Sequence, residues 1–240
     1  MNAQTGNKPT VVLVHGAFAE SSSWNGVIER LLDQQYPAIA VAVPLRGVRF
    51  DSDHLASVLD GIDGDVVLVG HSYGGIVISN AAAGRDRVKG LVFVGGFALD
   101  EGETAAQMAG KYEGGTLGDT LVTFKLPDGG IDLYIAQDKY HAQFTADSTA
   151  RDAAVMAVTQ RPIAESALNE PVGPAAWRAI PSWFIFGSED RNIPVAVHRF
   201  MAERAGSRRT VEIMGGTHTV GIPEAATVIE LVDAAAGTTA

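Results

Sequence analysis

The sequence of 240 residues contains no cysteine. This absence excludes a thiol nucleophile, a disulfide framework and any metal site that depends on thiolate ligands. Charged residues are also sparse, at 19%, and the 28 acidic residues outnumber the 18 basic ones, which gives a formal net charge of -10. This negative balance argues against nucleic acid or an anionic membrane surface as the main partner.

Long apolar runs are missing as well. None approaches the roughly 18 residues that a membrane span needs, and residues 1–9 are polar with a single lysine, so we expect no signal peptide. We therefore expect a cytoplasmic protein without a membrane partner. What the chain does have is 46% hydrophobic residues, which is typical of a globular protein with a sizeable core.

The hydrophobic residues gather in short runs that alternate with helix-compatible stretches. The runs are rich in Val, Ile and Phe and are closed by Gly, Pro or His, which is typical of strands buried on both faces. The runs lie at 10–14, 38–43, 66–69, 88–94, 183–186 and 210–214, and the helix-compatible stretches at 24–34, 52–59, 76–84, 195–205 and 223–235. The alternation predicts an α/β fold with a doubly wound, mainly parallel six-stranded sheet.

One region breaks this alternation. Residues 98–179 separate two predicted core strands and contain glycine pairs, scattered aromatic residues and a helix-like run at 148–160. An ordinary connection in an α/β fold is far shorter. We interpret the region as a mostly helical cap, with a small hairpin around 122–134, inserted into a core made of residues 1–97 and 180–240.

The segment Gly70-His71-Ser72-Tyr73-Gly74 has the pattern G-x-S-x-G and lies between a predicted strand and a predicted helix. In that setting the pattern is typical of a nucleophile elbow, in which glycines allow close backbone packing and the serine is held exposed in a strained turn. The alternative is an inert tight turn in a glycine-rich connection. The position between strand and helix favours Ser72 as a candidate nucleophile.

A serine nucleophile needs a base, and the base needs an acid that orients it. Asp190 and His218 follow the last two predicted strands, at the sheet edge where open α/β folds build their sites. Ser72, Asp190 and His218 also occur in the chain order serine, acid, histidine. Glu189 and Asp100 remain alternative acids.

The turn His15-Gly16-Ala17 closes the first predicted strand. Its glycine lets the chain turn so that the Ala17 amide faces the nucleophile, and the amides of Ala17 and Tyr73 are therefore the candidate oxyanion donors. We expect His15 and His71 to be structural. Three further histidines lie in or near polar helical runs and are expected to be solvated: His54, His141 and His198.

Large apolar side chains are candidates for a substrate pocket, because ligand sites are mostly apolar. The candidates, each with a plain core position as the alternative, are Phe18, Trp24, Phe97, Tyr140, Phe144, Met156 and Trp177. Phe18 and Phe97 are favoured, since each follows a core strand. Acidic residues do not recur with histidine at metal-ligand spacing, so we expect no metal and no cofactor.

Taken together, these motifs resemble the α/β-hydrolase superfamily. The spacing His15-Gly16-Ala17…Trp24, with G-H-S-Y-G-G, resembles the small branch of plant methyl esterases, hydroxynitrile lyases and bacterial pyrethroid-type carboxylesterases. The resemblance spans nearly the whole core, from Pro9 to Val232, and does not clearly extend to the cap. It implies the α/β-hydrolase fold and assigns the triad and the oxyanion amides to the residues named above.

The chain departs from the lyases of this branch at two positions. It has Gly16 where they carry a threonine, and Thr219 where they carry a lysine after the catalytic histidine. The departures favour a serine hydrolase that cleaves a carboxylic ester of a small apolar or aromatic molecule through an acyl-enzyme. A lactonase or amidase with the same triad is an alternative, and so is a small-molecule receptor with a vestigial site. We expect a monomer or a homodimer.

Overall fold

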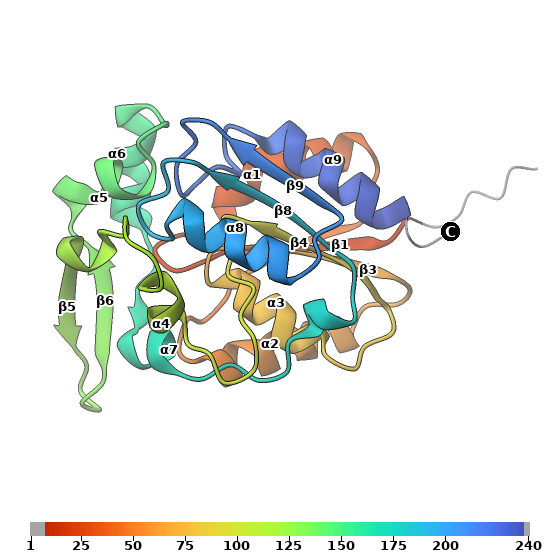
Figure 1. The fold of residues 1–240 in the computed structure, drawn as a ribbon, viewed down its shortest axis with the longest axis horizontal. Helices are drawn as coiled ribbons and strands as arrows, with labels where there is room; N and C mark the ends of the chain where they lie inside the picture. The colour runs from red at the N-terminus through yellow and green to blue at the C-terminus, as the bar shows by residue number, and fades with distance from the viewer. Residues whose placement is uncertain (1–7, 238–240) are drawn as a thin grey trace, which may run out of the picture.

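The computed structural model describes residues 8–237. A six-stranded parallel sheet forms its centre, in the order β2-β1-β3-β4-β8-β9 (Figure 1). The strands are β1 (Thr10–Val14), β2 (Ala38–Val41), β3 (Val66–His71), β4 (Val88–Val94), β8 (Ser182–Gly187) and β9 (Arg209–Ile213). They confirm the predicted fold class. The expectation of no signal peptide rests mainly on residues 1–7, which lie outside the described residues, as do 238–240.

Helices cover both faces of this sheet. One face packs against α1 (Asn25–Asp33) and α9 (Ala225–Ala236), and the other against α2 (Val48–Asp60), α3 (Gly74–Ala82) and α8 (Val195–Arg204). Both faces of β1 are buried, which accounts for its run of apolar residues. Successive side chains point to opposite faces of the sheet, so Val12 contributes to one core cluster and Leu13 to the other. No helix within residues 8–237 is long and apolar enough to cross a membrane.

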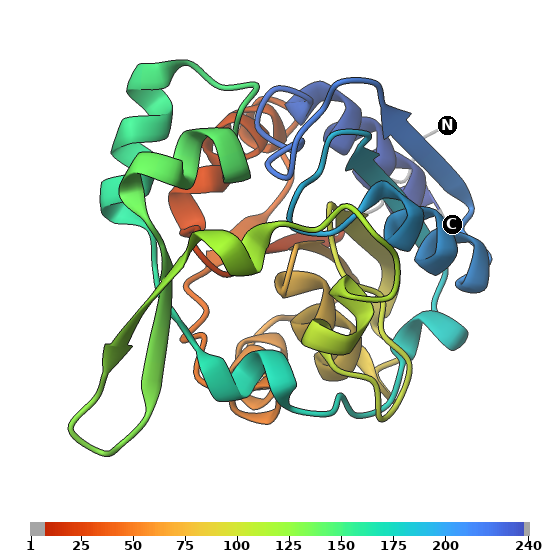
Figure 2. The ribbon, with the colours of Figure 1, turned by 60° about the vertical axis from the view of Figure 1, so that its left-hand side comes forward.

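The chain between β4 and β8 forms a separate set of short elements, hereafter the insertion (residues 98–179). They are α4 (Ala105–Ala109), β5 (Leu121–Lys125), β6 (Ile131–Ile135), α5 (Gln137–Phe144), α6 (Ala150–Thr159), β7 (Ile163–Ala164) and α7 (Glu165–Asn169). Helix α6 and the β5–β6 hairpin match the expectations from sequence. The hairpin projects away from the central sheet (Figure 2). Strand β7 pairs antiparallel with β6.

The insertion is bonded to the core close to the end of β1. The Phe18 amide donates to the Arg161 carbonyl at 3.0 Å, and the Tyr140 hydroxyl on α5 donates to the Phe18 carbonyl at 2.7 Å. Phe18 has φ of 60°, a left-handed conformation that is strained for a bulky residue. Both of its backbone polar groups are therefore fixed by the insertion, which holds this unfavourable turn in place.

The turn after β1 and the turn after β3 approach each other at backbone distance. A Cβ added to Gly74 would lie 2.3 Å from the Val14 carbonyl oxygen, and one added to Gly16 would lie 2.5 Å from the Ser72 Cβ. Ser72 itself has φ of 53°. A strained serine between close-packed glycines is the geometry typical of a nucleophile elbow.

Replacement of Gly74 by alanine should destabilise the protein, because the new methyl group overlaps the backbone of β1. We expect a loss of about 1–3 kcal/mol in the free energy of unfolding, measured by urea denaturation. Gly26→Ala is the matched control, since its Cβ would meet nothing closer than 3.6 Å. Equal stability of the two variants would contradict the close approach.

Candidate active site

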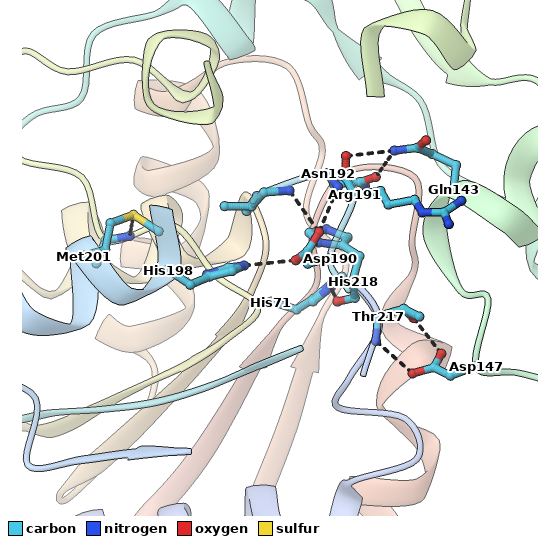
Figure 3. A network of polar contacts seen from close by, with 12 residues as sticks. His71, Gln143, Asp147, Asp190, Arg191, Asn192, His198, Met201, Thr217 and His218 are labelled. Atoms are coloured by element: carbon cyan, nitrogen blue, oxygen red, sulfur yellow. Dashed lines mark hydrogen bonds and ion pairs between the residues drawn. The ribbon is translucent and has the colours of Figure 1, made fainter. Parts of the chain in front are cut away.

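Asp190 and His218 lie against each other beyond the ends of β8 and β9 (Figure 3). His218 Nδ1 is 2.8 Å from Asp190 Oδ2. Because an ionised carboxylate only accepts hydrogen bonds, Nδ1 carries the proton, and Nε2 of the neutral ring is left with its lone pair. His218 Nε2 is buried and has no hydrogen-bond partner among the described residues. This histidine is therefore oriented as a base.

The Asp190 carboxylate is fully buried and is surrounded by donors. Its Oδ1 accepts the backbone amides of Asn192 at 2.8 Å and Ile193 at 2.9 Å. Burial alone would raise the pKa of Asp190, but the adjacent His218 and His198 outweigh it and hold the pKa below its usual range. Asp190 is therefore ionised and can stabilise a protonated His218.

A second histidine shares this carboxylate. His198 on α8 donates from Nε2 to Asp190 Oδ2 at 2.9 Å, is completely buried, and stacks on Phe186 with ring centroids 5.0 Å apart. The expectation that His198 is solvated is wrong. Helical spacing could have predicted its burial, because His198 lies between Val197 and Met201 on the buried face of α8.

The nucleophile candidate stands next to the loop that carries His218. His71, its chain neighbour, donates from Nε2 to the His218 carbonyl at 3.0 Å. The hydrogen bond from Ser72 Oγ to His218 Nε2 is not formed in this structure, because that nitrogen has no partner within residues 8–237. Such bonds are often long in an unliganded enzyme and shorten when substrate binds.

Two backbone amides beside Ser72 are available to a ligand. Within the described part of the chain, neither the Ala17 nor the Tyr73 amide donates a hydrogen bond. Both residues border the cavity at Ser72. The Tyr73 side chain is directed elsewhere, since its hydroxyl donates to Asp51 Oδ2 at 2.9 Å. The arrangement can accommodate a developing oxyanion.

His15 and His71 are structural, as the sequence suggests. His15 donates from Nδ1 to the Gly16 carbonyl and accepts the Val43 amide at Nε2, each at 2.9 Å, so its ring is neutral. Burial lowers the pKa of His15 to about 4. Burial, followed by the nearby His218, lowers the pKa of His71 to about 3. The two rings hold loops of the site in place.

The alternative acids do not reach the histidine. Asp100 forms an ion pair with Arg178, and Glu189 is exposed to solvent. Within residues 8–237, no cluster of three or more His, Asp or Glu side chains is placed to hold a metal ion. Asp190 is the carboxylate that the fold brings to His218.

An apolar cavity of about 90 Å³ opens beside Ser72. Its lining consists of small and apolar side chains with one amide: Ala17, Phe18, Ser72, Tyr73, Phe97, Ala105, Ala106, Ala109, Leu117, Leu168, Asn192 and Ile193. Two of the seven pocket candidates, Phe18 and Phe97, are among them. The sequence did not predict Asn192 as a pocket residue, because a single polar residue forms no pattern that indicates a place in a pocket.

The other five pocket candidates lie elsewhere. Tyr140 and Met156 border an outer groove of about 370 Å³, and Trp24 borders a small space beside His71. Phe144 packs on the His218 ring with centroids 5.1 Å apart. Trp177 is buried and donates from Nε1 to the Leu99 carbonyl at 2.8 Å. None of the five borders the cavity at Ser72.

Residues 11–231 match the alpha/beta hydrolase family. The chain belongs to this family. It is 26% identical to the alpha/beta hydrolase nvfD of Aspergillus novofumigatus over 250 residues, covering 96% of this chain and 97% of that protein.

Among solved structures, polyneuridine aldehyde esterase is similar with a TM-score of 0.79 at 20% identity, covering 94% of this chain and 98% of that one. A pyrethroid hydrolase from Sphingobium faniae JZ-2 has a TM-score of 0.71 at 18% identity over 94% of this chain and 98% of its own. The family match confirms the resemblance to the α/β hydrolases, and these neighbours share the fold.

Lowering the pH should destabilise this alpha/beta hydrolase. His15 and His71 have pKa values of about 4 and about 3 in the folded state, against 6.5 ordinarily. Below pH 6.5 the unfolded chain binds protons that the folded chain does not, so stability present above that pH is lost as the pH falls toward 4. Urea midpoints across this window should fall less steeply for His15→Gln than for the natural chain. Identical slopes would contradict the assignment.

Replacement of His198 should remove one of the hydrogen bonds that stabilise the Asp190 carboxylate. His198→Leu leaves Oδ2 with a single side-chain donor, and we expect the free energy of unfolding to fall by about 1.5–3 kcal/mol, the worth of a hydrogen bond to a charged group. His198→Gln can still donate an N–H and should retain most of the stability. Urea unfolding provides the measurement, and equal losses in both variants would contradict the donor role.

Proposed function

We propose that this protein is a serine esterase that cleaves a carboxylic ester of a small, largely apolar molecule. The observation that carries the proposal is the pair formed by Asp190 and His218, which leaves a free basic nitrogen in the loop beside Ser72. The two free amides of Ala17 and Tyr73 at the same cavity support it.

In the proposed acylation step, His218 Nε2 takes the proton of the Ser72 hydroxyl while Oγ attacks the ester carbonyl carbon. The Ala17 and Tyr73 amides donate to the oxygen that becomes negative in the tetrahedral intermediate. Asp190 stabilises the imidazolium that forms. The intermediate then collapses, the bond to the alkoxy oxygen breaks, and His218 returns its proton to the leaving alcohol.

In the proposed deacylation step, a water molecule takes the place of the alcohol. His218 accepts its proton as the water attacks the acyl carbon, and the same amides hold the second oxyanion. Collapse of this intermediate releases the acid and restores the serine hydroxyl. The same groups can open a lactone or cleave an amide, so comparison of ester, lactone and amide substrates tests the ester assignment.

The cavity sets the size and character of the proposed substrate. A volume of about 90 Å³ with an almost wholly apolar lining suits a short acyl or alcohol group and excludes a long chain unless the insertion moves. Phe18, fixed by the insertion, and Phe97 form part of its wall. We therefore expect short-chain esters to be better substrates than long-chain ones.

A fluorophosphonate probe tests the nucleophile directly, because it phosphonylates an activated serine. The natural chain should be labelled, and Ser72→Ala should lose labelling and on the order of 10³-fold or more of its kcat on p-nitrophenyl esters. Ser57→Ala, on the exposed side of α2, is the matched control and should behave like the natural chain. Failure to label the natural chain, or equal labelling of Ser72→Ala, would overturn the proposal.

A further inference from the structure

Besides Ser72 and Tyr73, the lining of the cavity includes one residue with a polar side chain. Asn192 is 5% exposed and borders the cavity together with alanine, leucine, isoleucine and phenylalanine side chains. A primary amide in such a lining either has its polar atoms satisfied by protein groups or presents them to a ligand. The hydrogen bonds around Asn192 decide between these cases.

The orientation of the Asn192 amide follows from its neighbours. Gln143 Nε2 lies 3.0 Å from the Arg191 carbonyl oxygen, and a carbonyl only accepts, so this end of Gln143 is its NH₂ group (Figure 3). The same nitrogen lies 2.8 Å from the Asn192 side chain, which must therefore present its oxygen there. The Thr116 hydroxyl donates to Gln143 Oε1 at 2.8 Å and completes the chain of bonds.

The remaining end of Asn192 is its NH₂ group. Among the described residues Nδ2 donates no hydrogen bond, and it is not one of the fully enclosed unpaired atoms of the chain. Its oxygen is bonded to Gln143 on the insertion, so the NH₂ group is the unpaired end of a side chain whose residue borders the cavity. The backbone amide of Asn192 is bonded to Asp190, which keeps the residue in place.

We propose that Asn192 is a specificity-determining residue that selects esters carrying an ether or carbonyl oxygen in the group that enters this cavity. The inference rests on the proposed esterase activity. An all-carbon group would leave the NH₂ donor unpaired in an apolar space, whereas an oxygen acceptor would satisfy it. Discrimination by an unpaired polar group is stronger than discrimination by a change in apolar size.

Matched substrates that differ by one atom test this selection. On the acid side, p-nitrophenyl 3-methoxypropanoate is compared with p-nitrophenyl pentanoate. On the alcohol side, 2-methoxyethyl acetate is compared with butyl acetate. Each pair exchanges one CH₂ for an oxygen at equal chain length. The ratio of kcat/KM within a pair, compared between variants, cancels the intrinsic reactivity of the esters.

Three variants separate the donor from general packing. Asn192→Leu removes the donor, and the preference for the oxygen-bearing ester should fall about 2- to 10-fold in at least one pair, the net worth of a neutral hydrogen bond. Asn192→Asp places an acceptor at the cavity and should reduce the preference further. Leu117→Ala enlarges the cavity without changing a donor and should leave the ratios unchanged.

The outcomes distinguish this inference from the activity on which it rests. Ratios in Asn192→Leu equal to those of the natural chain for both pairs, with hydrolysis still dependent on Ser72, would overturn the role of Asn192 alone. A ratio that shifts as much in Leu117→Ala as in Asn192→Leu would also overturn it. Absence of Ser72-dependent hydrolysis of all four esters would overturn both proposals.

Discussion

The end of β1 with the turn after it packs against the turn after β3 at two points, and both require glycine. Gly16 faces the Ser72 Cβ, and Gly74 faces the Val14 carbonyl, at distances that no side chain would allow. β1 and β3 are neighbours in the sheet, so their register fixes the approach of the two turns. The approach places the Ala17 and Tyr73 amides on the same cavity as Ser72, and the proposed chemistry depends on this.

Hydrogen bonds over long sequence separations keep these turns in position. His71 bonds the His218 carbonyl, and Asp147 on the insertion accepts from both the amide and the hydroxyl of Thr217, next to His218. The Phe18 turn is held from the insertion through both its amide and its carbonyl. The insertion thus stabilises the loops of the candidate site as well as shaping the cavity. This explains how a turn with a strained aromatic residue is maintained.

The part of the site that could be predicted from sequence is the part that local sequence patterns indicate. Apolar runs predict the six strands, and Ser72, Asp190 and His218 each lie on the loop that follows one, so the parallel sheet brings these loops to one edge. The burial of His198 and the orientation of Asn192 depend instead on tertiary contacts. Gln143 and Asn192 are 49 residues apart, and no periodicity relates them. The short elements of the insertion have too few residues for a clear apolar period, which is why most of them are not predictable.

Residue 192 contributes both to the support of Asp190 and to the lining of the cavity beside Ser72. Its backbone amide is one of two that hold Asp190 Oδ1, while its side-chain amide borders the cavity and is fixed from the insertion. A side-chain substitution there removes the proposed donor to the substrate and leaves the backbone donor to Asp190 intact. The geometry therefore allows substrate preference to change with little cost to the orientation of His218. In contrast, His198 contacts the carboxylate but does not border the cavity, so its loss should affect the support of Asp190 and the packing on Phe186 and leave the cavity lining unchanged.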